Sequence, residues 1–225
     1  MKRLLTLALA LACAPAVAQS EPDWLDSAQL MRVTAPAKSF FHDRDTDRCT
    51  GFCPRKAFVL KGDAVIVHER ASGFVDAEYI NAKGVATRGW LRTADLMADP
   101  GPKQAPSFWV GDWKRIEADI AIRAGTKAGT LSITGDAMWG SLDPERVKRG
   151  AVNIGEIEGV VAPKGFSLSF AMGENGTLPF AEVDEYGCAV RMRLLPPYLL
   201  VEDNYRCGGM NVSFTGTYVR KAARK

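Results

Sequence analysis

Apolar and polar residues alternate along much of the chain, and this alternation is the first guide to its fold. The clearest run places Ile116, Ala118, Ile120 and Ile122 on one face, with Arg115, Glu117, Asp119 and Arg123 on the other. Successive side chains of a β-strand point to opposite faces, so a period of two indicates a half-buried strand. Short runs of this kind, separated by glycine and polar turns, recur to the end of the chain and predict an all-β protein.

A proline-rich stretch divides the chain. Asp99–Pro106 contains three prolines and one glycine, a composition that can continue neither a helix nor a central strand. We assign residues 1–18 to a signal peptide, 19–35 to an N-terminal segment, 36–98 to a first domain, 99–107 to the Pro-rich linker, 108–220 to a second domain and 221–225 to a basic tail.

The first domain is predicted to be a small barrel of four or five strands. Strands are expected at Lys56–Leu60, Ala64–Glu69, Phe74–Ile80 and Val85–Leu91, with turns at Lys61–Asp63 and Asn81–Gly84. Helical spacing occurs only at Trp24–Val33, and Asp143–Arg149 is predicted to form one helical turn with Asp143 as its cap.

The second domain is predicted to be an antiparallel β-barrel or sandwich of seven to eight strands. After the Ile116–Arg123 run, strands are expected around Leu131–Ile133 and at Val152–Val161, Phe166–Phe170, Cys188–Leu194, Tyr198–Val201 and Val212–Val219. Trp109, Trp113 and Trp139 are expected to fill its core.

The N-terminus has the three parts of a secretory signal. Lys2 and Arg3 precede the apolar run Leu4–Cys13, and Ala16–Ala18 predicts cleavage before Gln19. The protein is therefore expected to be periplasmic or secreted. An alternative is lipid modification at Cys13. No apolar run approaches the roughly 20 residues that cross a bilayer, so no integral membrane segment is expected.

Four cysteines follow the signal, an even number that predicts two disulfides in an exported protein. Three connectivities are possible, and proximity in sequence favours Cys49–Cys53 and Cys188–Cys207. A zinc site is the less favoured interpretation, because thiolate ligands need a reducing compartment.

Charge and residue counts limit the function. Lys and Arg number 29 against 26 Asp and Glu, which gives a formal charge of +3 and no basic excess of the kind that nucleic-acid binding needs. Asp43, Asp45 and Asp47 alternate as in a calcium loop, but the glycine and the twelfth-position carboxylate are missing. We expect no cofactor and no metal.

The two histidines, His42 and His68, lack a free thiol or a serine motif to activate, and His68 is expected to point outward from a strand end.

The first domain resembles a bacterial SH3-like (SH3b) domain. The resemblance rests on Lys56–Val65, Gly73–Val75, Lys83–Gly84, Thr87–Leu91 and Asp95–Leu96. It implies a recognition module, found in envelope proteins and in some cases binding cell-wall peptide. The aromatic residues Phe41, Phe74, Tyr79 and Trp90 are then candidates for the barrel core or for a peptide groove.

The second domain carries weaker resemblances. Gly111 and Trp113 resemble the first strand of lipocalin-type (calycin) barrels, and Val201–Tyr218 resembles the ending of uncharacterised exported bacterial proteins, some of which contain a segment similar to a lysozyme-inhibitor family. Asp203 and Asn204, beside Cys207–Gly209, form either a structural turn or a rim loop that contacts a ligand.

These observations favour a secreted, non-catalytic binding protein of the cell envelope whose partner is a cell-wall peptide, a small ligand or an envelope protein. The alternative is an inhibitor or immunity protein against a peptidoglycan hydrolase. A third hypothesis is an enzyme that acts on glycans through paired carboxylates such as Glu117 with Asp119 or Asp184 with Glu185.

Overall fold

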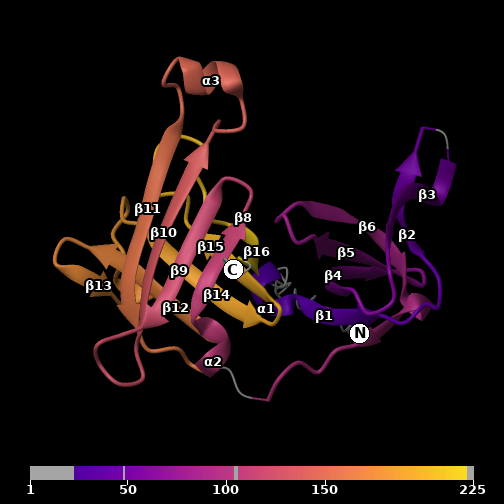
Figure 1. Ribbon diagram of the computed structural model, residues 1–225, viewed down its shortest axis with the longest axis horizontal. Helices are drawn as coiled ribbons and strands as arrows, with labels where there is room; N and C mark the ends of the chain where they lie inside the picture. The colour runs from indigo at the N-terminus through magenta and orange to yellow at the C-terminus, as the bar shows by residue number, and fades with distance from the viewer. Residues whose placement is uncertain (1–22, 48, 104–105, 222–225) are drawn as a thin grey trace, which may run out of the picture.

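The computed structural model describes residues 23–47, 49–103 and 106–221. The fold is all-β, as the alternating pattern predicts. It consists of two antiparallel sheets of seven and nine strands, and the second sheet is nearly closed into a barrel (Figure 1). The signal peptide and its cleavage site lie outside the described residues. No helix in the described ranges has the length and apolar character needed to cross a bilayer.

The first sheet has the strand order β3-β2-β6-β5-β4-β1-β7. Its strands are β1 Gln29–Val33, β2 Ser39–Thr46, β3 Cys49–Val59, β4 Ala64–Ala71, β5 Phe74–Ile80, β6 Ala86–Arg92 and β7 Leu96–Ala98, with the 3-10 turn η1 Thr93–Asp95 before β7. The predicted turns are present. Gly84 closes the β5–β6 hairpin with a φ of 84°, a conformation that glycine adopts without strain.

The segment after Asp23 differs from the helix expected over Trp24–Val33. Only α1 Trp24–Ser27 is helical, and Gln29–Val33 is a strand between β4 and β7. In a strand, successive side chains point to opposite faces. Leu30 therefore packs into one apolar cluster and Met31 and Val33 pack into another, which a short helix could not achieve. The first sheet therefore has more strands than the four or five predicted, and it begins upstream of residue 36.

The second sheet has the order β11-β10-β9-β8-β16-β15-β14-β12-β13. Its strands are β8 Gly111–Arg115, β9 Ala118–Ala124, β10 Leu131–Trp139, β11 Asn153–Val161, β12 Ser167–Gly173, β13 Gly176–Leu178, β14 Ala189–Leu195, β15 Tyr198–Asp203 and β16 Gly216–Arg220. The short elements are α2 Pro106–Trp109, α3 Pro144–Lys148, which Asp143 caps as predicted, and η2 Phe180–Glu182.

Three details of this sheet differ from the predicted pattern. It has nine strands rather than seven to eight, because the short, glycine-containing β13 carries no alternating signal. Ile116 lies in the β8–β9 turn, where Glu117 has a φ of 59°, so the buried face of β9 starts at Ala118. The last strand begins at Gly216 rather than Val212, because side-chain hydrogen bonds to Asp203 hold residues 213–215 as a loop.

The interior of the second barrel is filled with apolar side chains. Trp109 and Trp113 are buried as predicted, with Phe170, Phe214 and Tyr218 beside them, whereas Trp139 only packs against this core. Burial raises the pKa of Tyr218, whose hydroxyl donates to the carbonyl of Phe214. The barrel is therefore a packed core.

Both disulfides have the predicted pairing, Cys49–Cys53 and Cys188–Cys207. The second disulfide holds a loop against β11, the strand at the edge of the nearly closed sheet. Gly208 forms an antiparallel bridge with Gly155, and the Gly209 amide donates to the carbonyl of Ile154. At the other end of the same edge, the Thr177 hydroxyl accepts a hydrogen bond from the Val160 amide. The unpaired edge of β11 is thus covered near both ends.

A third apolar cluster joins the two sheets. It includes Leu25 from α1, Leu30, Ile66 and Ile80 from the first sheet, and Tyr198 and Leu200 from the second. The Tyr198 hydroxyl donates to the Ala64 carbonyl at 2.7 Å across this boundary. The two halves therefore share a buried interface.

Candidate ligand-binding sites

Three aromatic side chains gather on the surface of the first sheet. Phe52 of β3 stacks on Phe74 of β5 with ring centroids 3.9 Å apart, and Trp90 of β6 lies edge-on to Phe52 at 5.3 Å. All three are partly exposed. We call this group the aromatic cluster. Partly exposed aromatic side chains supply large, rigid contact areas, so they are well suited to binding.

His42 lies beside the aromatic cluster. Its ring is 5.0 Å from Phe74, and its Nδ1 is 3.2 Å from the carbonyl oxygen of Trp90. A carbonyl can only accept, so in this contact Nδ1 carries the proton and Nε2 is the acceptor in the neutral ring. A hollow of about 310 Å³ adjoins His42 and is also lined by Phe52, Phe74, Lys38 and Arg92.

The charges around this hollow are biased toward cations. The Asp95 carboxylate already accepts a hydrogen bond from the Ser39 hydroxyl at 2.7 Å. The Lys38 Nζ atom, by contrast, lies 4.0 Å from the ring centroid of Phe58. In the described part of the chain, neither Lys38 nor Arg92 forms an ion pair. The hollow can therefore take a ligand that offers both an apolar group and a carboxylate.

The alternating aspartates beside it are used locally. Asp43 pairs with Arg55 at 3.5 Å, and Asp45 accepts from the Gly51 amide at 2.8 Å. Among the described residues, no group of three or more His, Cys, Asp or Glu side chains is placed to hold a metal ion.

The four aromatic candidates in this half fall into two groups. Phe74 and Trp90 belong to the aromatic cluster. Phe41 is fully buried in the core and Tyr79 packs against that core, so the structure places neither in the cluster. Phe52 was not among the candidates, because it lies between Cys49 and Cys53, ahead of the first strand expected at Lys56–Leu60. The adjacent Cys49–Cys53 disulfide was the one available signal, since it constrains the backbone on either side of Phe52.

Asp203 and Asn204 are parts of the loop scaffold. Asp203 is 3% exposed, and its Oδ1 accepts hydrogen bonds from the Ser213 hydroxyl, the Phe214 amide and both the amide and hydroxyl of Thr215. Asn204 is exposed, yet its side chain bonds the Ala189 amide and the Gly187 carbonyl. The Asp203 carboxylate is therefore buried against its own loop, which corresponds to the structural-turn alternative.

The same loop displays other side chains. Tyr205 and Met210 are 69% and 79% exposed, and Tyr186 beside them is 74% exposed. The Cys188–Cys207 disulfide and the hydrogen bond from Asn153 to the Met210 carbonyl hold the loop. We call these three side chains the rim patch. A rigid loop that presents tyrosine and methionine is typical of protein-binding surfaces.

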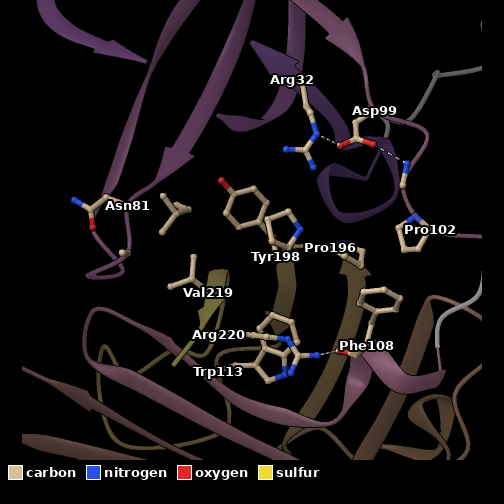
Figure 2. Close-up of a pocket in the computed structure, with 14 residues that line it drawn as sticks. Arg32, Asn81, Asp99, Pro102, Phe108, Trp113, Pro196, Tyr198, Val219 and Arg220 are labelled. Atoms are coloured by element: carbon tan, nitrogen blue, oxygen red, sulfur yellow. Dashed lines mark hydrogen bonds and ion pairs between the residues drawn. The ribbon is translucent and has the colours of Figure 1, made fainter. Parts of the chain in front are cut away.

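A groove of about 670 Å³ lies between the two sheets (Figure 2). The first sheet and linker contribute Arg32, Ile80 and Asp99, and the second sheet contributes Tyr198, Val219 and Arg220. We call it the inter-sheet groove. Figure 2 shows Arg32 and Asp99 on one side, with Arg220 and Trp113 on the other.

A polar contact crosses the boundary near this groove. Thr217 of β16 donates to Glu78 of β5 at 2.7 Å, and His68 Nε2 lies 3.7 Å from the same carboxylate oxygen. Burial raises the pKa of Glu78, but the interactions with His68 and Thr217 outweigh it and hold this pKa below its usual value. His68, expected to point outward, is thus largely enclosed, because its ring lies between the Glu78 carboxylate and the Trp24 ring.

A second polar group lies at the same boundary. Arg191 of β14 pairs with Asp23 and Glu202, and the indole of Trp24 donates to Glu202 at 3.1 Å. Burial opposes ionisation of Asp23, but hydrogen bonds from Arg191 and the Leu25 amide lower its pKa overall. These contacts attach the N-terminal segment to the second barrel.

No family model, no curated protein and no solved structure matches this chain. The functional argument therefore rests on the sites themselves.

Proposed function

We propose that the protein is a non-catalytic binding protein of the cell envelope that recognises an extended peptide through the aromatic cluster of the first sheet. The two disulfides fit a location outside the cytoplasm, where such bonds persist. The proposed class of ligand is a cell-wall stem peptide, which offers methyl groups for the aromatic rings and carboxylates for Lys38 and Arg92.

The observation that carries the proposal is the stacking of Phe52 on Phe74 beside Trp90 at the surface. Aromatic side chains of this size are normally buried, and three of them held in fixed contact on β3, β5 and β6 form a preorganised surface. His42 Nε2 adds an acceptor for a peptide N–H. The packed interior of the second barrel also favours binding at a surface over binding inside the barrel.

The test is titration of the mature protein with a synthetic stem pentapeptide, followed by calorimetry. Phe52→Ala and Trp90→Ala should each weaken binding by about tenfold, the loss expected when an interface aromatic is truncated. Tyr186→Ala on the second barrel is the matched control and should bind as the parent does. Folded protein that shows no saturable binding, or binding that neither cluster variant weakens, would contradict the proposal.

The rim patch supports a second candidate function, inhibition of a peptidoglycan hydrolase by an inserted loop. The supporting observation is the high exposure of Tyr205 and Met210 on a loop fixed by a disulfide. In a lysozyme inhibition assay with the parent protein, Met210→Ala should then relieve inhibition and Phe52→Ala should not. Absence of inhibition by the parent protein against a panel of wall hydrolases would remove this candidate.

A further inference from the structure

The inter-sheet groove contains a cation with no counter-charge. Arg220 donates to the carbonyl oxygens of Val110 and Phe108, both neutral acceptors. Within the described ranges, no carboxylate lies at ion-pair distance from it, although the other arginine of the groove, Arg32, is paired with Asp99 at 2.7 Å. Arg220 is exposed as a whole, and partial desolvation of its guanidinium lowers its pKa.

The position of Arg220 is built into the fold. Its guanidinium lies 4.6 Å from the ring centroid of Trp113, a buried side chain of the barrel core. A Cβ atom on Gly111 would lie 2.3 Å from Arg220 Nη1, so the absence of a side chain there leaves the space that the guanidinium occupies. A guanidinium has five N–H donors in a planar fork, and the two hydrogen bonds to carbonyls leave others free to bind an anion.

The rest of the groove is mainly apolar. Ile80 of the first sheet and Tyr198 and Val219 of the second line it, and Figure 2 shows Phe108 beside Arg220. Its volume of about 670 Å³ is within the range of small-molecule sites. One end is therefore cationic, Ile80, Tyr198 and Val219 give an apolar lining, and the Arg32–Asp99 pair at the opposite side is neutral overall.

We propose that the inter-sheet groove binds a small amphipathic carboxylate. The carboxylate accepts hydrogen bonds from Arg220, and the apolar body lies on Ile80, Val219 and Tyr198. Because the groove is lined by both sheets and by the linker, such a ligand contacts both halves and stabilises their packing. This site is separate from the aromatic cluster, and the proposal does not depend on peptide binding there.

The test uses octanoate, with octanol as the neutral probe and octylamine as the cationic probe, titrated into the full mature chain by calorimetry. Octanoate should bind one per chain, about fivefold or more tightly than octanol, because a charge-assisted hydrogen bond adds to the shared apolar contact. Octylamine should bind more weakly than either. Equal affinity for octanoate and octanol would overturn the proposal.

Two variants locate the site. Arg220→Gln should reduce octanoate affinity to the level of octanol and leave octanol affinity unchanged. Ala82→Trp places a large side chain at an exposed position of the β5–β6 loop that lines the groove, and it should abolish binding of both probes without touching Arg220. Arg220 donates to the Phe108 carbonyl, so Arg220→Gln also changes that contact. Ala82→Trp leaves Arg220 in place and is therefore the independent measurement.

Arg123→Gln is the matched control, since Arg123 is an exposed arginine of the same barrel paired with Asp112. It should bind octanoate as the parent does. Octanoate binding that persists in Ala82→Trp, or that falls equally in Arg123→Gln and Arg220→Gln, would show that the groove is not the site.

Discussion

Thr217 on the last strand donates its hydroxyl proton to Glu78 of the first sheet at 2.7 Å, and this hydrogen bond joins the two halves of the protein. Glu78 is also 3.7 Å from His68 Nε2, and its side chain is 18% exposed. The carboxylate thus lies in a mostly enclosed boundary, where its charge has a measurable effect on stability.

Acidification should weaken this boundary. The pKa of Glu78 is lowered in the folded state, because the contacts with His68 and Thr217 outweigh the opposing effect of burial. Its stabilising contribution is therefore present above the usual glutamate pKa and is lost as the pH falls through the lower, folded value. Glu78→Gln should reduce the free energy of unfolding by about 1 kcal/mol at pH 7, and this deficit should shrink as the pH falls below the usual glutamate pKa.

The measurement is a series of melting curves for parent and Glu78→Gln between pH 7 and pH 3. Glu69→Gln, on the exposed part of neighbouring β4, is the control and should follow the parent at every pH. A deficit of the same size at both ends of the range would mean that the charge of Glu78 is not responsible.

Closure of the second barrel should depend on Gly208 far more than on its neighbour Gly209. A Cβ atom on Gly208 would lie 2.6 Å from the Cα of Gly155 and 2.9 Å from the Ile154 carbonyl oxygen, both backbone atoms that must move apart. On Gly209 the nearest atom would be 3.3 Å away, in the Asn153 side chain. Gly208→Ala should destabilise the protein by about 2 kcal/mol in urea unfolding, and Gly209→Ala by less than about 1 kcal/mol. Equal effects would contradict this account of the closure.

Asp203 should be a determinant of stability. Removing its carboxylate leaves the Phe214 amide and the Ser213 and Thr215 hydroxyls without this acceptor, and the Thr215 amide loses one of its two acceptors. Asp203→Ala should therefore lower the free energy of unfolding by about 3 kcal/mol, whereas Asn204→Ala, at an exposed position, should lower it by about 1 kcal/mol. Urea unfolding of both variants checks the order, and the reverse order would show that the loop is held mainly by Asn204.

The first sheet should require β1 to fold. A fragment of residues 35–98 lacks Gln29–Val33, which leaves β4 and β7 without the strand that pairs with both. We expect that fragment to lose its structure gradually on heating, whereas residues 23–103 should melt cooperatively. Circular dichroism compares the two, and cooperative melting of the shorter fragment would show that β1 is dispensable.

Local patterns in the sequence determined a large part of this fold. The hairpin at Asn81–Gly84, the cap of α3 at Asp143 and both disulfide pairings follow from residues close together in the chain. The buried positions of β9, β10 and β11 follow from period-two alternation. These features were predictable because their causes are local: a turn needs a particular backbone angle, a cap needs a nearby acceptor, and a half-buried strand has one apolar face.

Only the tertiary structure decided the features that depend on distant partners. Gln29–Val33 became a strand because β4 and β7 pair with it on either side, although its own spacing suggested a helix. Asp203 was drawn inward by the amides of Phe214 and Thr215 and by the hydroxyls of Ser213 and Thr215. Phe52 contacts Phe74 although β2 and β6 lie between their strands in the sheet order, so only the folded sheet brings the two rings together. The inter-sheet groove has no local signature, since Ile80 and Arg220 meet only when two sheets pack. Periodicity records which face of a strand is buried, but it does not record which strand or sheet buries it.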